Sequence, residues 1–353
     1  MVKSALAGKA QTVLGIIEGE ELGVTLPHEH LIFDGKAMFS EPSGASERGL
    51  AYQPVSMEIL SWLRYHPYEN IDNMRLFDEQ EAIAEAMLFK QAGGNTIVDV
   101  TNIGLGRDPK ALARISRVTG LNIIMGSGHY TAPSHSADMS AKTEEEITEE
   151  IVRDITIGVS ESEIRAGIIG EIGGSWPFED NEKKAMRAAA RAQQLTGASI
   201  NIHPGRKRET TFEIVEILAN ADADLSRVIL SHIEARVRDH SGRCELAKAG
   251  CCIEYDLWGW EGHFPSYFTA DILDIPNDTQ RIYEIRQLID EGYLNQILIS
   301  HDICTKSRRA CYGGWGYAHI SNYVVPMMLK RGMTNEQINT IMVENPKRLL
   351  CFV

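Results

Sequence analysis

Two kinds of segment alternate along the chain. Helical periodicity appears in stretches such as 78–94, 108–120 and 181–197, and the pair Thr143 and Glu146 has the spacing of a capping box. Between these stretches lie short runs that are almost continuously apolar, which is typical of parallel strands buried on both faces. There are eight such runs, at 22–26, 95–100, 121–126, 166–172, 198–203, 226–232, 250–256 and 295–302.

Eight strands alternating with helices predict an α/β fold, a single (β/α)8 TIM barrel that uses residues 1–353 as one domain. A doubly wound open sheet is the competing fold, but no glycine-rich dinucleotide fingerprint follows an early strand. We expect a short β-hairpin ahead of the barrel. We also expect a long insertion after the first strand, over 39–70, that is ordered against the barrel by its prolines and aromatic residues.

The overall charge of the chain narrows the range of expected binding partners. Lys and Arg number 35 and Asp and Glu number 49, so the net charge is −14, which argues against nucleic acid or an anionic membrane as a partner. No apolar run is long enough for a membrane span, and no secretory signal is visible. The six cysteines form no C-x-x-C pair, so we expect reduced thiols and a cytoplasmic protein. A homodimer is left open.

Metal-ligand side chains stand at the carboxyl ends of the predicted strands. His28 and His30 are two residues apart, so they point to the same side of a strand. The other strand-end candidates are Glu171, His203, His232 and Asp302. In a barrel these ends meet at one mouth, so the six side chains predict a metal site there. His301 faces away from Asp302, and we expect it to form hydrogen bonds behind the barrel.

The number of ligands indicates two divalent ions, because a single catalytic zinc usually takes three protein ligands. Glu171 is the natural carboxylate to bridge them. Imidazole and carboxylate ligands without a thiolate suit zinc, with manganese, iron or cobalt as alternatives.

These residues resemble the phosphotriesterase family of the amidohydrolase superfamily. The family signature is H-x-H after the first strand, a bridging residue after the fourth, single histidines after the fifth and sixth, and Asp after the eighth. In archetypal members the bridge is a carboxylated lysine, whereas here it is Glu171. The chain is most similar to the phosphotriesterase-related branch, through segments 11–15, 168–177, 202–206, 254–259, 312–320 and 344–347.

The resemblance implies hydrolysis of a linear amide C–N bond, in N-acetyltaurine and related N-acetyl amino acids, to acetate and the free amine. A hydroxide that bridges the two ions would be the nucleophile. His28, His30 and Asp302 would hold the more buried ion, and His203 and His232 the more exposed one. Asp302 would also carry the hydroxide proton to the leaving amine.

The expected substrate is a small anionic N-acyl compound. Arg206 would hold its acid group, and Tyr130 would act beside the hydroxide or the oxyanion, as a catalytic and substrate-binding residue. Trp176 and Tyr255 would line the pocket. Two other functions stay open: a lactonase or an organophosphate or carboxyl esterase that uses the same site, and a ligand-binding homologue that has lost catalysis.

Overall fold

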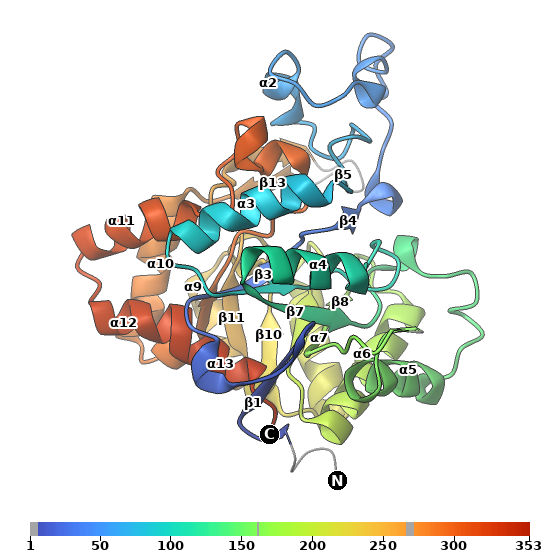
Figure 1. Cartoon of the computed structure of the whole chain (residues 1–353), viewed down its shortest axis with the longest axis vertical. Coiled ribbons are helices and arrows are strands. Elements are labelled where there is room, and N and C mark those ends of the chain that lie inside the picture. The colour runs from blue at the N-terminus through green and yellow to red at the C-terminus, as the bar shows by residue number, and fades with distance from the viewer. Residues whose placement is uncertain (1–5, 161, 266–271) are drawn as a thin grey trace.

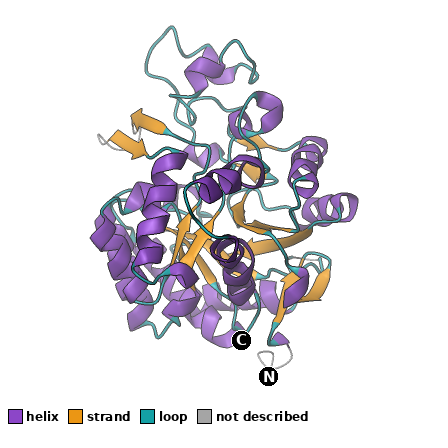
Figure 2. Ribbon diagram, turned by 90° about the vertical axis from the view of Figure 1, so that its left-hand side faces the viewer, coloured by secondary structure: helices purple, strands orange, loops and turns teal. Residues whose placement is uncertain are grey.

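Eight parallel strands form the centre of the molecule in a computed structural model that describes residues 6–160, 162–265 and 272–353. They run in the spatial order β14-β11-β10-β9-β8-β7-β6-β3 and form a nearly closed barrel inside a layer of helices, which confirms the TIM-barrel fold class (Figures 1 and 2). Their bounds are β3 Thr25–Glu29, β6 Thr96–Asp99, β7 Asn122–Ser127, β8 Ile168–Gly173, β9 Ile200–His203, β10 Val228–Leu230, β11 Cys252–Tyr255 and β14 Ile297–Ile299.

Each predicted run overlaps an observed strand, and the predicted and observed bounds differ most for the first strand. The prediction placed that strand at 22–26, but β3 ends three residues later, at Glu29. The physical reason is that His28 and Glu29 are polar yet fully buried, so a hydrophobic pattern ends before the strand does.

Helices follow most of the barrel strands and have local signals at their ends. The N-cap Asp108 precedes Pro109, Thr143 and Glu146 form the expected capping box, and Gly197 ends its helix with a φ of 78°. The helices are α2 Leu60–Leu63, α3 Glu79–Gln91, α4 Pro109–Thr119, α5 Glu144–Thr156, α6 Asp180–Thr196, α7 Arg208–Asn220, α8 Ile233–Arg236, α9 His240–Lys248, α10 Asp278–Asp290, α11 Val325–Lys330, α12 Asn335–Asn339 and α13 Asn345–Leu350.

Segments outside the barrel lie at its two ends. The hairpin of β1 (Lys9–Thr12) and β2 (Gly15–Glu18) lies with the C-terminal residues at one end, where Ala7 bridges Phe352. The insertion that carries α2 projects at the other end (Figure 1), and its two ends are tied by pairing of β4 (Phe33–Asp34) with β5 (Arg75–Leu76). A second hairpin joins β12 (Gly262–Pro265) to β13 (Ile272–Ile275).

The seam between the first and last strands is closed by side chains. The Ser300 hydroxyl donates to the His28 carbonyl (2.8 Å) and accepts from the His28 N–H (3.1 Å). The buried Glu29 carboxylate accepts hydrogen bonds from His301 N, His301 Nδ1 and Ile303 N at 2.8 to 3.0 Å, and it lies 2.8 Å from Ser300 Oγ, whose single proton is shared between Glu29 and the His28 carbonyl. Glu29 therefore fixes the chain on both sides of Asp302.

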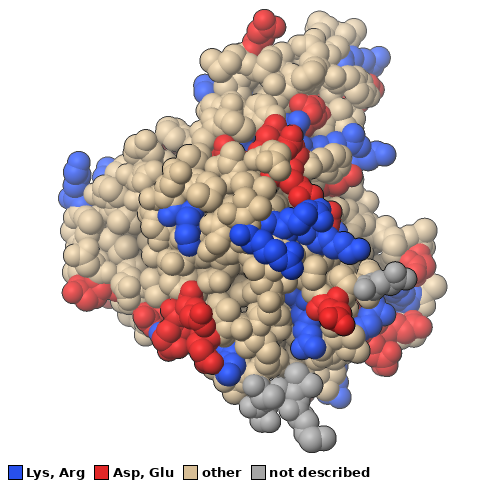
Figure 3. Space-filling view, in the orientation of Figure 1, with Lys and Arg blue, Asp and Glu red and all other residues tan. Residues whose placement is uncertain are grey.

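Charges of both signs are interspersed on the face that carries α4, as Figure 3 shows, and there Arg114 pairs with Glu79. In the described part of the chain, no helix combines the length and the apolar character that crossing a bilayer requires.

Replacing Glu29 with Ala should lower the free energy of unfolding by about 3–5 kcal/mol, because the buried donors at the seam lose their charged acceptor. Denaturant unfolding monitored by circular dichroism measures this change. Glu216→Ala, at an exposed position on α7, is the matched control and should stay within about 0.5 kcal/mol of the wild type. A loss in Glu29→Ala no larger than that of the control would contradict the assigned role.

Candidate metal centre

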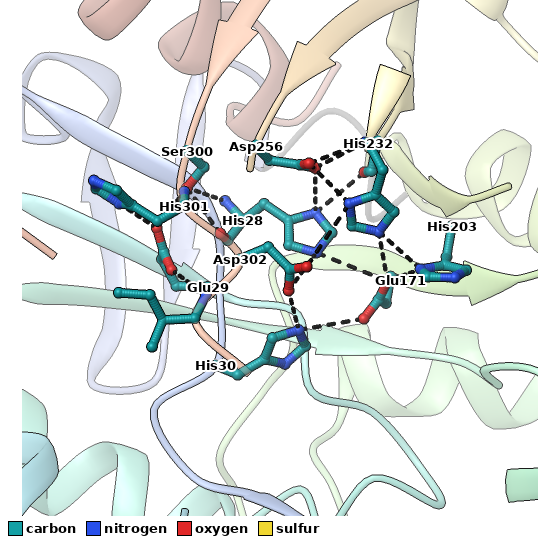
Figure 4. A network of polar contacts seen from close by, with 12 residues as sticks. His28, Glu29, His30, Glu171, His203, His232, Asp256, Ser300, His301 and Asp302 are labelled. Carbon is teal, nitrogen blue, oxygen red and sulfur yellow. Dashed lines mark hydrogen bonds and ion pairs between the residues drawn. The ribbon is translucent and has the colours of Figure 1, made fainter. Parts of the chain in front are cut away.

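The six predicted ligand side chains meet at the carboxyl-terminal mouth of the barrel, as Figure 4 shows. His30 Nε2 lies 3.2 Å from Asp302 Oδ1 and 3.4 Å from Glu171 Oε1. On the other side of Glu171, its Oε2 is 3.1 Å from His203 Nδ1. The same His203 nitrogen is 2.8 Å from His232 Nε2. Glu171 therefore lies in the middle of the cluster, between the histidines.

Three of the histidines are oriented by polar groups outside the cluster. The bonds run from His28 Nδ1 to Ser231 Oγ and Glu254 Oε2 (3.1 and 3.2 Å), from His30 Nδ1 to Thr101 Oγ1 (2.8 Å) and from His232 Nδ1 to Asp256 Oδ1 (2.8 Å). Outer partners of this kind fix the orientation and tautomer of metal-binding histidines. The inward Nε2 of His28 is buried and has no hydrogen-bond partner among the described residues, as expected for a nitrogen that serves as a metal ligand.

Three compact groups of possible ligands share His28; one of them consists of His28 with its outer partners Glu254 and Asp256, and two lie within the cluster. Of these two, one is His28, His30 and Asp302, the set predicted for the more buried ion. The other consists of His28, Glu171 and His232. In each group, the possible ligand atoms all lie within 4.8 Å of one another. His203 was predicted to hold the more exposed ion together with His232, but it belongs to none of these groups and lies beside the second, against Glu171 and His232. The arrangement can hold one or two divalent cations.

Two of the ligand residues have left-handed backbone conformations. His232 has a φ of 56° and Asp302 a φ of 52°. Non-glycine residues rarely adopt this conformation, and it is concentrated at functional sites, where the surrounding structure maintains it. For Asp302, the hydrogen bonds of Glu29 to the N–H groups of His301 and Ile303 provide that support.

The buried carboxylates favour positive charge in the cluster. Burial alone would lower the pKa of His28, but Asp256, Glu254 and Glu171 outweigh it and raise the pKa to about 9. Burial is likewise outweighed at His30, where Asp302 and Glu171 raise the pKa to about 10. A site that draws protons onto two histidines also attracts metal cations, so the residues fit the ions that the sequence predicts.

The remaining groups at the cluster are consistent with nitrogen and oxygen ligands. Burial and the nearby His232 lower the pKa of His203 to about 3, so its imidazole is already in the neutral form that binds a metal, whereas His28 and His30 would release their protons when a cation binds. Cys304 lines the same cavity, but burial, Asp302 and Glu171 raise its pKa well above the usual range. Its sulfur is therefore held as a thiol.

Two adjoining cavities open from the cluster. The inner cavity, of about 50 Å³, is lined by the cluster residues other than His28, together with Phe33, Leu257 and Trp260 among others. The outer cavity, of about 280 Å³, is lined by Trp176, Pro133 and Pro177, among others. The boundary between them, which we call the waist, is formed by the residues that line both: Met38, Tyr68, Tyr130, His203, Arg206 and Arg236.

Three of the four predicted substrate residues lie at these cavities. Arg206 and Tyr130 are at the waist, where the Tyr130 hydroxyl is 3.1 Å from His203 Nε2, and the partly exposed Trp176 lines the outer cavity. His301 donates from Nδ1 to Glu29 (2.8 Å), away from the cluster, as predicted.

The expectation for Tyr255 needs correction, because this side chain is fully buried in the core and lines neither cavity. Glu254 and Asp256 flank it and reach the cluster through His28 and His232. Since side chains alternate along a strand, a residue between two inward-facing carboxylates must face outward.

Several residues at the site were not predicted from the sequence. Glu254 and Asp256 have the same two-residue spacing at a strand end as His28 and His30, so alternation could have identified them. Tyr68 lies in the insertion and Arg236 ends the short helix α8. Neither has a sequence signal that points to the mouth.

The barrel and the buried cluster at its mouth define a class of protein, the metal-dependent hydrolases built on a TIM barrel. The model of the phosphotriesterase family matches residues 8–350, and the chain belongs to this family.

Similar proteins cover the whole chain. It is 44% identical over 350 residues to an N-acetyltaurine hydrolase of Xenopus tropicalis, with 99% of each chain covered. It is also 44% identical over 349 residues to a phosphotriesterase-related protein of Nematostella vectensis, covering 98% of this chain and 99% of that one. Among solved structures, a resiniferatoxin-binding protein from Rhodobacter sphaeroides superposes with a TM-score of 0.94 at 36% identity, covering 99% of this chain and 96% of the other.

Glu171→Ala should lose at least one bound ion per chain, because it removes the central carboxylate that lies between the histidines. Elemental analysis of the purified protein after metal loading measures this loss. Glu209→Ala, at an exposed position on α7, controls for the change in charge and should keep the metal content of the wild type. Wild-type metal content in Glu171→Ala would rule out Glu171 as a bridging ligand.

Proposed function

We propose that this protein hydrolyses N-acyl amides whose amine part carries an acid group, with N-acetyltaurine as the leading substrate and N-acetyl amino acids as related ones. The products are acetate and the free amine. The observation that carries the proposal is the buried cluster, which opens at a waist containing two arginines. N-acetyltaurine hydrolases similar over 99% of the chain support the same substrate class.

Two divalent ions, zinc in the first place, are proposed to bind at the cluster. The ligands would be His28, His30, Glu171, His203, His232 and Asp302. Such ions would supply an acidified water and polarise the amide carbonyl, as they do in two-metal hydrolases.

Asp302 is proposed as the proton carrier of the reaction. Its Oδ1 is 3.2 Å from His30 Nε2, and its Oδ2 is 3.9 Å from His232 Nδ1, so the carboxylate lies across the cluster. From there it accepts the proton of the attacking water and delivers it to the amide nitrogen. An amine leaves poorly unless it is protonated, so this transfer decides the rate of amide cleavage.

Tyr130 is proposed to donate a hydrogen bond to the reacting carbonyl oxygen. Its hydroxyl lies at the waist beside His203. Burial and the nearby Glu171 raise its pKa well above the usual range, so the hydroxyl keeps its proton at neutral pH and can donate it in a hydrogen bond.

The dimensions of the cavities support a short acyl group. The inner cavity of about 50 Å³ has room for only a few water molecules, so a short acyl group fits it better than a long one. A larger amine part would extend past Arg206 toward the outer cavity of about 280 Å³.

A hydrolysis panel tests the proposed function. The metal-loaded protein is assayed with N-acetyltaurine, N-acetyl amino acids, lactones, carboxyl esters and phosphotriesters, and chelated protein serves as the control. We expect the highest kcat/KM with the acidic N-acetyl amides and no turnover after chelation. A higher kcat/KM with lactones or esters would support the alternative hydrolase, and binding without turnover of any substrate would support a ligand-binding homologue.

Asp302→Asn should lower kcat for N-acetyltaurine by about 100-fold or more, because the amide side chain cannot accept the proton. Steady-state assays at equal metal content measure this effect. Asp290→Asn, at an exposed position on α10, should behave like the wild type. A near wild-type kcat in Asp302→Asn would overturn the proposed proton transfer.

A further inference from the structure

Arg236 is held directly beside two of the proposed metal ligands. It ends the short helix α8, which begins immediately after His232. Its Nε donates to the carbonyl of Pro204 (3.0 Å), and Pro204 follows His203 in the chain. The guanidinium is therefore fixed relative to the ends of β9 and β10, and it lines both the inner and the outer cavity.

Arg236 is partly buried, and it differs in its contacts from other arginines that are buried or partly buried. Four of them have carboxylate partners: Arg107 with Asp154 (2.9 Å), Arg243 with Glu284 (3.2 Å), Arg281 with Glu234 (3.0 Å) and Arg309 with Glu81 (3.3 Å). Arg227 donates to three backbone carbonyls, and Arg308 donates to two. Among the described residues, Arg236 forms no ion pair, and its one side-chain hydrogen bond goes to Pro204.

The surroundings of Arg236 make an unpaired cation costly. Burial, and then the charge of Arg206, lower its pKa below the usual value for arginine. Two cations at one waist repel each other, and a partly buried cation without a counter-ion is unfavourable. An anion bound between Arg206 and Arg236 would remove both costs, and guanidinium groups suit the oxygen atoms of a sulfonate or carboxylate.

We propose that Arg236 is the main specificity residue for the acid group of the substrate, with Arg206 as its second contact. This inference rests on the proposed amide hydrolysis and adds to it the position of the acid group. Because the waist adjoins the cluster, the acid group must be separated from the amide nitrogen by a short spacer. Substrates with a sulfonate or carboxylate one or two carbon atoms from that nitrogen meet this requirement.

The test compares two amides of equal length, N-acetyltaurine and its neutral sulfonamide, 2-acetamidoethanesulfonamide. The variants are Arg236→Gln, Arg206→Gln and the control Arg238→Gln, whose exposed side chain pairs with Asp274 (2.7 Å). We expect the ratio of kcat/KM for the acid to that for the neutral amide to fall by about ten-fold or more in Arg236→Gln, the scale of a lost charge-assisted hydrogen bond. The fall should be smaller in Arg206→Gln, and the control should keep the ratio of the wild type. Equal losses on both substrates would mean a structural role and would overturn the inference.

A binding measurement separates this inference from the proposed function. Propane-1-sulfonate is titrated calorimetrically into the metal-loaded wild type, Arg236→Gln and Arg238→Gln. Weaker binding in Arg236→Gln alone supports the inference even if the wild type hydrolyses no amide, in which case only the proposed function fails. If the wild type cleaves N-acetyltaurine but Arg236→Gln keeps both sulfonate affinity and the substrate ratio, the inference fails and the proposed function stands.

Discussion

The structure depends on one buried carboxylate at the seam of the barrel. Glu29 lies between the two histidines of the first strand, and it accepts hydrogen bonds from the residues on either side of Asp302. On the opposite side of the same segment, the Arg308 guanidinium donates to the carbonyls of His301 and Asp302 and stacks over Trp260 at 4.7 Å. The ligands of the first and last strands are therefore positioned by the interaction that closes the barrel.

Much of the fold and of the ligand cluster could be predicted because the relevant signals are local. Buried parallel strands show as apolar runs, and the rule that strand ends meet at one mouth brings distant residues together without any knowledge of packing. Where alternation was applied, to His28 and His30 and to His301 against Asp302, the structure agrees. It was not applied to Tyr255, and there the expectation was wrong.

The walls of the site could not be predicted in this way. Tyr68 lies in the insertion, where no periodic pattern indicates which side chains face the barrel. Arg236 is placed by a four-residue helix and by a bond to the Pro204 carbonyl, both of which depend on how the ends of β9 and β10 are arranged in space. The cluster is thus supported by strands, whereas the cavities are formed largely by the segments between strands. Loop residues can change the choice of substrate while the metal ligands and their partners stay the same.

The central carboxylate of this site belongs to an encoded residue. A carboxylated lysine, as in archetypal members of the family, forms by reaction with dissolved carbon dioxide and can revert to the free amine. Glu171 needs no such reaction, because its carboxylate is present as soon as the chain is synthesised. A metal centre built on Glu171 would then require only folding and a supply of metal, whatever the bicarbonate concentration around the protein.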